Sequence, residues 1–321
     1  MTDVQLPQGL PRRVPVRQVL CLLPLALVLL VAVRHRSVLE EGFGQLRGAE
    51  WPWLVAAVAA TCLTWVAAAF TRQGAVVERL PARRLLATQF AAGAANHLLP
   101  SGLGAGAVNL RFMTVCGVPL ARSSAALALY LLAESITRVG LLLALLITFP
   151  GALHLGPLVP SGAVGPLALT AGAGLCAAVG ASLLLVRRLR TAVWSFLRTA
   201  LGEARSVHTR PARALALWGG SLAFPALQAA GLAAVGRALG LPVPPAHIVV
   251  AYLAATVAVA LVPVPGGIGS VEAALIVTLV AAGAPVALAT AVVLGYRIIT
   301  VWLPLLPGAL TLGALLRLKV I

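Results

Sequence analysis

The stretch that decides the fold reads Leu261-Val-Pro-Val-Pro-Gly-Gly-Ile-Gly-Ser-Val-Glu272 and lies within an otherwise apolar part of the chain. Its two prolines and three glycines interrupt a helix, and its last residue is a carboxylate. A helix broken at membrane depth exposes backbone N–H and C=O groups, which are tolerated only where protein covers them or where they line a wet cavity. The stretch therefore predicts a broken helix at a functional site inside a membrane.

The composition is that of a polytopic membrane protein. Of 321 residues, 60% are hydrophobic and only 10% are charged, and the mean hydropathy is +1.01. A soluble domain carries about 25% charged residues. The net charge of +16 does not indicate nucleic-acid binding, because the arginines stand at the ends of apolar runs, where they set membrane orientation. The four cysteines lie in apolar segments without metal-ligand spacing, so we expect no metal site and no cofactor.

Six apolar runs are long enough to cross a bilayer, namely 19–33, 51–70, 121–149, 163–186, 214–237 and 286–316. Two further runs, 85–117 and 247–283, are broken by proline and glycine. Arginine-rich segments precede the first span, follow the second and fourth, and close the chain. The positive-inside rule places all of them in the cytoplasm, so each broken run must enter and leave by one face. We therefore expect an all-α protein with about six spanning helices, two re-entrant helical hairpins and both termini in the cytoplasm.

The two broken runs resemble each other, which predicts an inverted repeat. Pro100-x-Gly102-Leu-Gly104 matches Pro265-x-Gly267-Ile-Gly269, Gly117-Val-Pro119 matches Gly283-Ala-Pro285, and Tyr130 matches Tyr296. We expect a cytoplasmic tail over residues 1–17 and one transmembrane domain over 18–321, with repeats over about 85–149 and 247–316. Inverted repeats with broken helices near the midplane are a transporter architecture. Independent proline and glycine kinks in a structural bundle are the alternative.

Only two of the eight carboxylates, Glu134 and Glu272, lie within the apolar stretches. Glu272 falls in the first turn of the half-helix after the glycines, where a carboxylate can cap the helix. We favour a functional role instead, because a carboxylate at this depth costs about 2.5–3.5 kcal/mol. Glu134 and Arg138 lie four residues apart on one helix face and are expected to pair.

Three arginines in apolar stretches, Arg111, Arg138 and Arg297, outnumber these two acids. The surplus positive charge predicts an anionic ligand, and a guanidinium fits phosphate oxygens well. His97, beside the break of the first hairpin, is a candidate for titration or for headgroup binding. Asn109 is expected to satisfy backbone groups.

These motif residues resemble the flippase-like membrane-domain family of lysylphosphatidylglycerol synthases. The resemblance covers about residue 85 to the C-terminus, and it rests on Pro263–Ala274, Gly283 and Tyr296-Arg297 in the second half, and on Leu99-Pro100, Gly106, Arg111, Gly117, Glu134 and Arg138 in the first. It implies a membrane domain that moves aminoacylated or glycosylated lipids between leaflets. Ala105 departs from the acid of many members, and Arg111 would stand in for a motif arginine placed earlier. The soluble aminoacyl-transfer domain of the fused synthases is missing from the chain, so we do not expect lysyl-lipid synthesis.

Together these observations predict a multi-pass protein of the inner (plasma) membrane, not an enzyme, that moves a phosphate-containing lipid between leaflets. The predicted substrate-binding residues are His97, Arg111, Glu134, Arg138, Gly266, Gly267, Gly269, Glu272, Tyr296 and Arg297. Arginines and glycine N–H groups would hold the phosphate, and Glu272 would take a headgroup amine or a coupling proton.

Two other functions stay open at this point. One is a lipid-binding accessory subunit of a glycolipid or lipid-modification pathway, and the other is a secondary transporter for a small solute or ion. The expected partner is a membrane lipid with an anionic headgroup, and a second copy of the chain or a membrane enzyme are further candidates.

Overall fold

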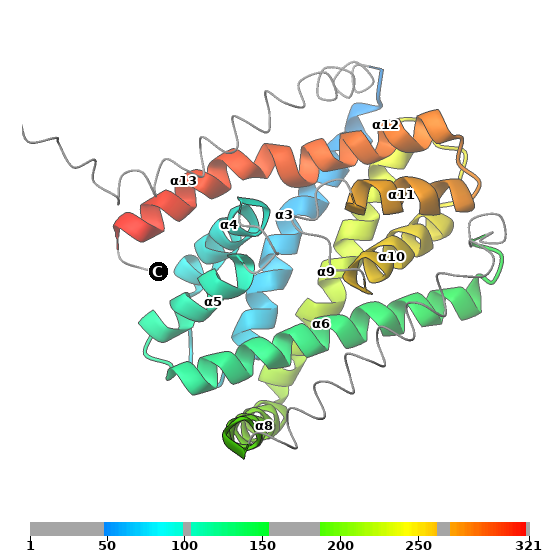
Figure 1. Ribbon diagram of the computed structural model, residues 1–321. Coiled ribbons are helices and arrows are strands. Elements are labelled where there is room, and N and C mark those ends of the chain that lie inside the picture. Colours follow the sequence, from blue (N-terminus) through cyan, green and yellow to red (C-terminus); the bar gives the residue numbers. More distant parts are fainter. Residues whose placement is uncertain (1–47, 99–103, 154–186, 262–269, 319–321) are drawn as a thin grey trace, which may run out of the picture.

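The computed structural model describes residues 48–98, 104–153, 187–261 and 270–318, and every regular element within these ranges is a helix (Figure 1). Four helices in these ranges are long and apolar enough to cross a bilayer, and they are α3 (Trp51–Gly74), α6 (Leu120–Thr148), α9 (Pro211–Ala238) and the continuous helix Val286–Arg317. The predicted all-helical membrane fold is thereby confirmed, with helices at four of the six predicted spans. The predicted spans 19–33 and 163–186 lie outside the described residues.

The two broken runs form hairpins of equal arm lengths. The first consists of α4 (Ala82–Leu98) and α5 (Gly104–Val115), and the second of α10 (Pro245–Leu261) and α11 (Ser270–Ala281). Each hairpin has a first arm of 17 residues and a second arm of 12 residues. The arms of the first hairpin approach closely, because a Cβ atom on Gly104 would lie 2.1 Å from the Ala95 carbonyl oxygen.

The turns after the two hairpins are also alike. Gly117 and Gly283 both have a positive φ, of 90° and 99°. In each turn the glycine N–H and the N–H after it donate to carbonyls three and five residues earlier, at 2.9–3.1 Å. This is the pattern by which a left-handed glycine ends a helix. A proline two residues later, Pro119 or Pro285, then precedes the next long helix. The sequence match of Gly117-x-Pro119 with Gly283-x-Pro285 therefore reflects one local structure used twice.

The long helices run in alternating directions. At one end of the bundle α3 begins where α9 ends, since the Glu50 N–H donates to the Ala238 carbonyl at 3.0 Å. At the other end Glu78, in the loop between α3 and α4, forms an ion pair with Arg122, in the first turn of α6, at 2.6 Å. The chain thus enters and leaves the α4–α5 hairpin at the same end of the bundle. A re-entrant hairpin requires this geometry, and its depth in a bilayer stays a prediction.

We call residues 82–148 the first unit and residues 245–317 the second unit. Figure 1 shows the two units facing opposite ways. α6 crosses the lower side of the view from left to right, and the helix Val286–Arg317 crosses the upper side from right to left. The α4–α5 hairpin lies on the left and the α10–α11 hairpin on the right. This arrangement agrees with the predicted inverted repeat.

Two central helices, α3 and α9, pack through small residues. A Cβ atom on Gly220 would lie 2.5 Å from the Thr71 hydroxyl and 2.7 Å from the Ala67 carbonyl oxygen, and one on Gly74 would lie 2.2 Å from the Leu217 nitrogen. Glycines of this kind let two helix backbones approach closely where lipid supplies no hydrophobic driving force. The hairpins and the long helices α6 and Val286–Arg317 surround this pair.

Two further elements were not predicted. The last long helix contains a π-helical turn, η2 (Ile298–Trp302), between α12 (Val286–Arg297) and α13 (Leu303–Arg317). Such turns are frequent beside functional sites, and this one follows Arg297 directly. The basic segment before α9, interpreted as a polar loop, is the helix α8 (Arg187–His208).

Candidate functional site

Polar side chains from both units and from α9 lie near one another between the two hairpins. We define this central cluster as His97 (α4), Arg138 (α6), Gln228 (α9), Tyr252 (α10), Glu272 (α11), and Tyr296 and Arg297 (α12). Its members stand far apart in the sequence, and the two units of the fold bring them together.

Glu272 and Arg297 form an ion pair within this cluster. The Arg297 Nε donates to the Glu272 Oε1 at 2.6 Å, and the two side chains are only 22% and 13% exposed. Glu272 lies in the first turn of α11, as predicted, where the helix dipole also favours a negative charge. Arg297 was predicted to hold a phosphate, and Glu272 was predicted to take a headgroup amine or a proton. In the structure the two side chains bind each other.

His97 of the first hairpin lies near charged residues of the second unit. It stands in the last turn of α4, half-buried, and interacts electrostatically with both Arg297 and Glu272. The end of the first hairpin arm therefore lies within electrostatic reach of the start of α11. The predicted glycine nest of Gly266, Gly267 and Gly269 lies outside the described residues.

Two buried tyrosines, Tyr252 and Tyr296, belong to the same cluster. The rings of Tyr252 and Tyr296 meet edge to face, with centroids 6.2 Å apart and an interplanar angle of 75°. The Tyr252 hydroxyl donates to the Gln228 side-chain oxygen. Both tyrosines lie within electrostatic reach of the Arg138 guanidinium.

Arg138 carries the surplus charge. Its side chain is half-buried, and within the described residues its Nε is buried without a hydrogen-bond partner and its guanidinium has no ion pair. The prediction that Glu134 would pair with Arg138 is wrong, because Glu134 binds Arg72 instead.

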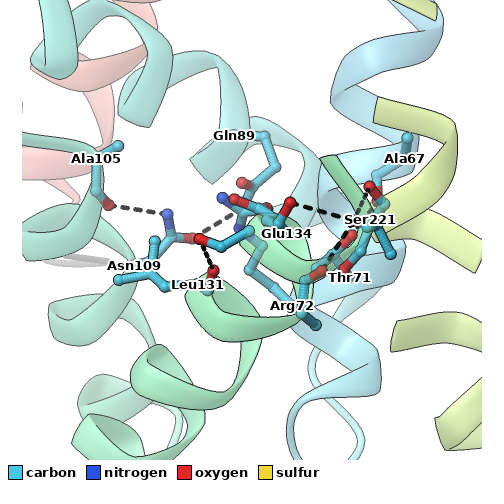
Figure 2. A network of polar contacts seen from close by, with 12 residues as sticks. Ala67, Thr71, Arg72, Gln89, Ala105, Asn109, Leu131, Glu134 and Ser221 are labelled. Carbon is cyan, nitrogen blue, oxygen red and sulfur yellow. Dashed lines mark hydrogen bonds and ion pairs between the residues drawn. The ribbon is translucent and has the colours of Figure 1, made fainter. Parts of the chain in front are cut away.

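Figure 2 shows the network around Arg72, which lies near the cytoplasmic end predicted for α3. The Arg72 Nη1 donates to the Glu134 Oε1 at 2.5 Å, and its guanidinium lies 4.3 Å from the ring centroid of Tyr130. The side chains of Arg72 and Glu134 are 10% and 16% exposed. Arg72 belongs to the arginine-rich segment that was expected to follow the second span, because the apolar run stops at Phe70, whereas α3 continues to Gly74.

Neighbouring groups complete this network. The Asn109 Nδ2 donates to the Ala105 carbonyl at 2.8 Å, so its predicted role in satisfying backbone is confirmed. Gln89 donates to the Asn109 Oδ1 at 3.0 Å (Figure 2).

A proline in α9 creates a further polar contact between helices. Pro225 has no N–H, which leaves the Ser221 carbonyl without its helical donor. The Thr137 hydroxyl of α6 lies 3.0 Å from that carbonyl and 2.8 Å from the Ala133 carbonyl of its own helix, so its proton is shared between the two helices.

Arg111 does not join either network. It lies exposed on α5, and the contacts of the described residues link it to neither Arg138 nor Arg297. The interior charges are therefore arranged differently from the prediction. Arg72 neutralises Glu134, Arg297 neutralises Glu272, and Arg138 is left over.

Residues 18–308 match the family described as the lysylphosphatidylglycerol synthase TM region. The chain belongs to this family. No curated protein matches the sequence. The match begins well before residue 85, so the lysylphosphatidylglycerol synthase TM region takes in α3 as well as the hairpins.

Membership of this family confirms the resemblance inferred from the motifs and ties the protein to the lipid chemistry of membranes. The geometry adds what the motifs could not show. The second-half motif residues Glu272, Tyr296 and Arg297 meet in the central cluster, while the first-half pair Glu134 and Arg138 divides between two networks.

Proposed function

We propose that this protein moves a lipid with an anionic, phosphate-containing headgroup between the leaflets of the inner (plasma) membrane. The central cluster would be the headgroup site. The family supports a role in lipid modification or transport, and lysylphosphatidylglycerol itself combines a phosphate with amines.

The observation that carries this proposal is Arg138, which has no ion pair among the residues that the structure describes. A half-buried guanidinium whose Nε lacks a partner among the described residues is costly in an apolar surrounding. An anionic group that docks on it removes that cost and forms charge-assisted hydrogen bonds. Phosphate suits the site because guanidinium N–H groups match its oxygens in a forked arrangement.

The adjacent ion pair gives the headgroup a second anchor. Arg297 donates to Glu272 through its Nε, and in the described part of the chain no other hydrogen bond of its guanidinium is seen, so further N–H groups could bind a phosphate. A phosphate that competes for Arg297 would release Glu272 toward a headgroup amine or a proton. The pair thus exchanges an internal contact for ligand contacts, which limits the electrostatic cost of binding.

The inverted units supply the means of moving such a headgroup. Both units contribute to the cluster, the first through His97 and Arg138 and the second through Glu272 and Arg297. Motion of one hairpin against the other would open the cluster to one side of the membrane and then to the other. The π-helical turn directly after Arg297 is a place where the long helix can adjust its winding.

Substitution of Arg138 tests this proposal. Arg138→Gln should weaken binding of a phosphate lipid about 10- to 100-fold, since hydrogen bonds to a charged group contribute about 1.5–3 kcal/mol. Native mass spectrometry would measure co-purified and added lipids, and a fluorescent phospholipid in proteoliposomes would measure transfer between leaflets. Arg317→Gln is the matched control, because it removes the same charge from an exposed position at the end of α13.

The two measurements separate the possible outcomes. Loss of both binding and transfer in Arg138→Gln, with the control unchanged, supports the proposal. Binding by the wild-type protein without any transfer would make it a lipid-binding accessory subunit. Normal binding and transfer by Arg138→Gln would remove Arg138 from the site.

A further inference from the structure

The helix α8 presents an unusual face to its surroundings. Leu197, Arg198, Leu201 and Arg205 stand three, four, seven and eleven residues after Trp194, which places all five on one side of α8, and we call them the outward stripe. All five are exposed, and the three apolar side chains are 58%, 41% and 69% exposed in chain order. The Arg198 guanidinium lies 5.7 Å from the ring centroid of Trp194.

The opposite side of α8 is fixed to the bundle. Val207 is fully buried in a hydrophobic core that includes residues of α4, α5 and α6. Glu203 accepts two hydrogen bonds from Arg122 of α6, from its Nε at 2.5 Å and from its Nη2 at 3.1 Å. Arg122 in turn donates to Glu78, so three segments are held together at this point. The outward stripe is therefore a surface of the folded protein, because α8 cannot turn it inward without breaking these contacts.

The position of α8 brings the stripe to the membrane surface. Only Thr209 and Arg210 separate α8 from the spanning helix α9, which begins at Pro211. Two residues reach about 7 Å at most. In Figure 1 α8 is seen end-on at the lower edge of the bundle, while α9 runs across the picture, so α8 lies crosswise to the spanning helix. A helix with this placement lies along the plane of the headgroups.

The composition of α8 favours an anionic lipid surface over a neutral one. The sequence of α8 contains five arginines, Arg187, Arg188, Arg190, Arg198 and Arg205, and its one acid, Glu203, is already paired with Arg122. Tryptophan and leucine side chains partition into the boundary between headgroups and acyl chains, and arginines beside them extend to lipid phosphates. A neutral lipid surface would accommodate the apolar side chains but would offer the arginines no negative charge.

We propose that the outward stripe of α8 docks on the anionic lipid headgroups of the arginine-rich side of the membrane. The stripe is a binding surface separate from the central cluster, and it does not depend on whether the protein moves lipid. Through Glu203, Arg122 and Glu78 the docked helix is joined to both ends of the α4–α5 hairpin, since residue 78 precedes this hairpin and residue 122 follows it.

Spin labels on the full-length protein test this proposal. The native cysteines are replaced by serine, a single cysteine is placed at Leu197 or, for comparison, at Ser195, and the labelled protein is reconstituted in vesicles of phosphatidylcholine with or without phosphatidylglycerol. The accessibility of the label to oxygen and to a polar nickel complex reports its depth. In anionic vesicles we expect the label at Leu197 about 5–10 Å into the boundary region and the label at Ser195 in water.

A charge variant identifies the contribution of the arginines. Arg198→Gln with Arg205→Gln should shift the Leu197 label toward the aqueous phase in anionic vesicles, to its level in neutral ones. The control Arg83→Gln with Arg84→Gln removes the same charge from exposed residues at the start of α4, at the same end of the bundle, and should leave the depth unchanged.

Two results would overturn the proposal. The first is a Leu197 label that is as accessible to the nickel complex as the Ser195 label in both kinds of vesicle. The second is a Leu197 label that is protected equally in detergent and in both vesicle types, and that shows spin–spin broadening at full labelling. This second result would make the stripe a contact between copies of the protein.

Discussion

Replacement of Glu134 by glutamine should destabilise the protein by leaving the Arg72 guanidinium without its counter-charge. The two side chains are 10% and 16% exposed and their nitrogen and oxygen atoms lie 2.5 Å apart, so water screens the pair weakly. Removing one partner of a buried ion pair costs about 3–5 kcal/mol. Glutamine keeps an acceptor oxygen and the Tyr130 ring still faces Arg72, so we expect a loss of about 2–3 kcal/mol in the free energy of unfolding.

A double-mutant cycle in mixed micelles measures this loss. Arg72→Met alone should also be destabilising, because it leaves the Glu134 carboxylate unpaired. The double variant Arg72→Met with Glu134→Gln should recover about 1–2 kcal/mol relative to the sum of the single variants, since neither charge then remains buried. Glu50→Gln, at an exposed position before α3, should change stability by less than about 0.5 kcal/mol. Additive single effects, or a Glu134→Gln variant as stable as Glu50→Gln, would show that this ion pair does not hold α3 to α6.

Two other substitutions are expected to separate function from packing. Glu272→Gln should abolish lipid transfer in proteoliposomes at every pH while the free energy of unfolding falls by no more than about 1–2 kcal/mol, because Glu272 is 22% exposed and glutamine still accepts from Arg297; full transfer by this variant would show that the charge of Glu272 is not needed. Gly220→Ala should destabilise the α3–α9 contact by about 1–3 kcal/mol, because its Cβ would lie 2.5 Å from the Thr71 hydroxyl. Gly219→Ala, whose Cβ meets nothing within 4 Å, should be neutral or slightly stabilising in the same thermal unfolding measurement, and equal losses in both variants would refute the packing argument.

The hairpins could be predicted from sequence because their signals are local. Proline and glycine interrupt an apolar run at fixed places, and a glycine with positive φ at Gly117 and at Gly283 ends an arm by the same hydrogen bonds. The position of Glu272 in the first turn of α11 followed in the same way from the glycines before it. Such features depend on a few neighbouring residues, which a single sequence contains in full.

The pairing of charges could not be predicted because it depends on how distant helices pack. Spacing alone suggested Glu134 with Arg138, four residues apart, yet a residue from α3, 62 positions earlier, takes the carboxylate. The last turn of α3 is only weakly apolar, so the helical position of Arg72 was not predicted. The helix α8 was missed for a different reason, since its arginines make the segment polar on average, although its apolar residues recur with helical periodicity.

The two interior acids show where the symmetry of the fold ends. In the first unit Glu134 is neutralised by Arg72, which stacks on Tyr130, and in the second unit Glu272 is neutralised by Arg297, which follows Tyr296, the sequence counterpart of Tyr130. Arg138 breaks this symmetry. It belongs to α6 of the first unit but interacts with Tyr252 and Tyr296 of the second. Each described acid of the interior thus has its own cation, and the one additional cation stands where the two units meet. Among the described residues, the acid of each half is neutralised separately and Arg138 is left at the centre, an arrangement suited to receive a negative charge there.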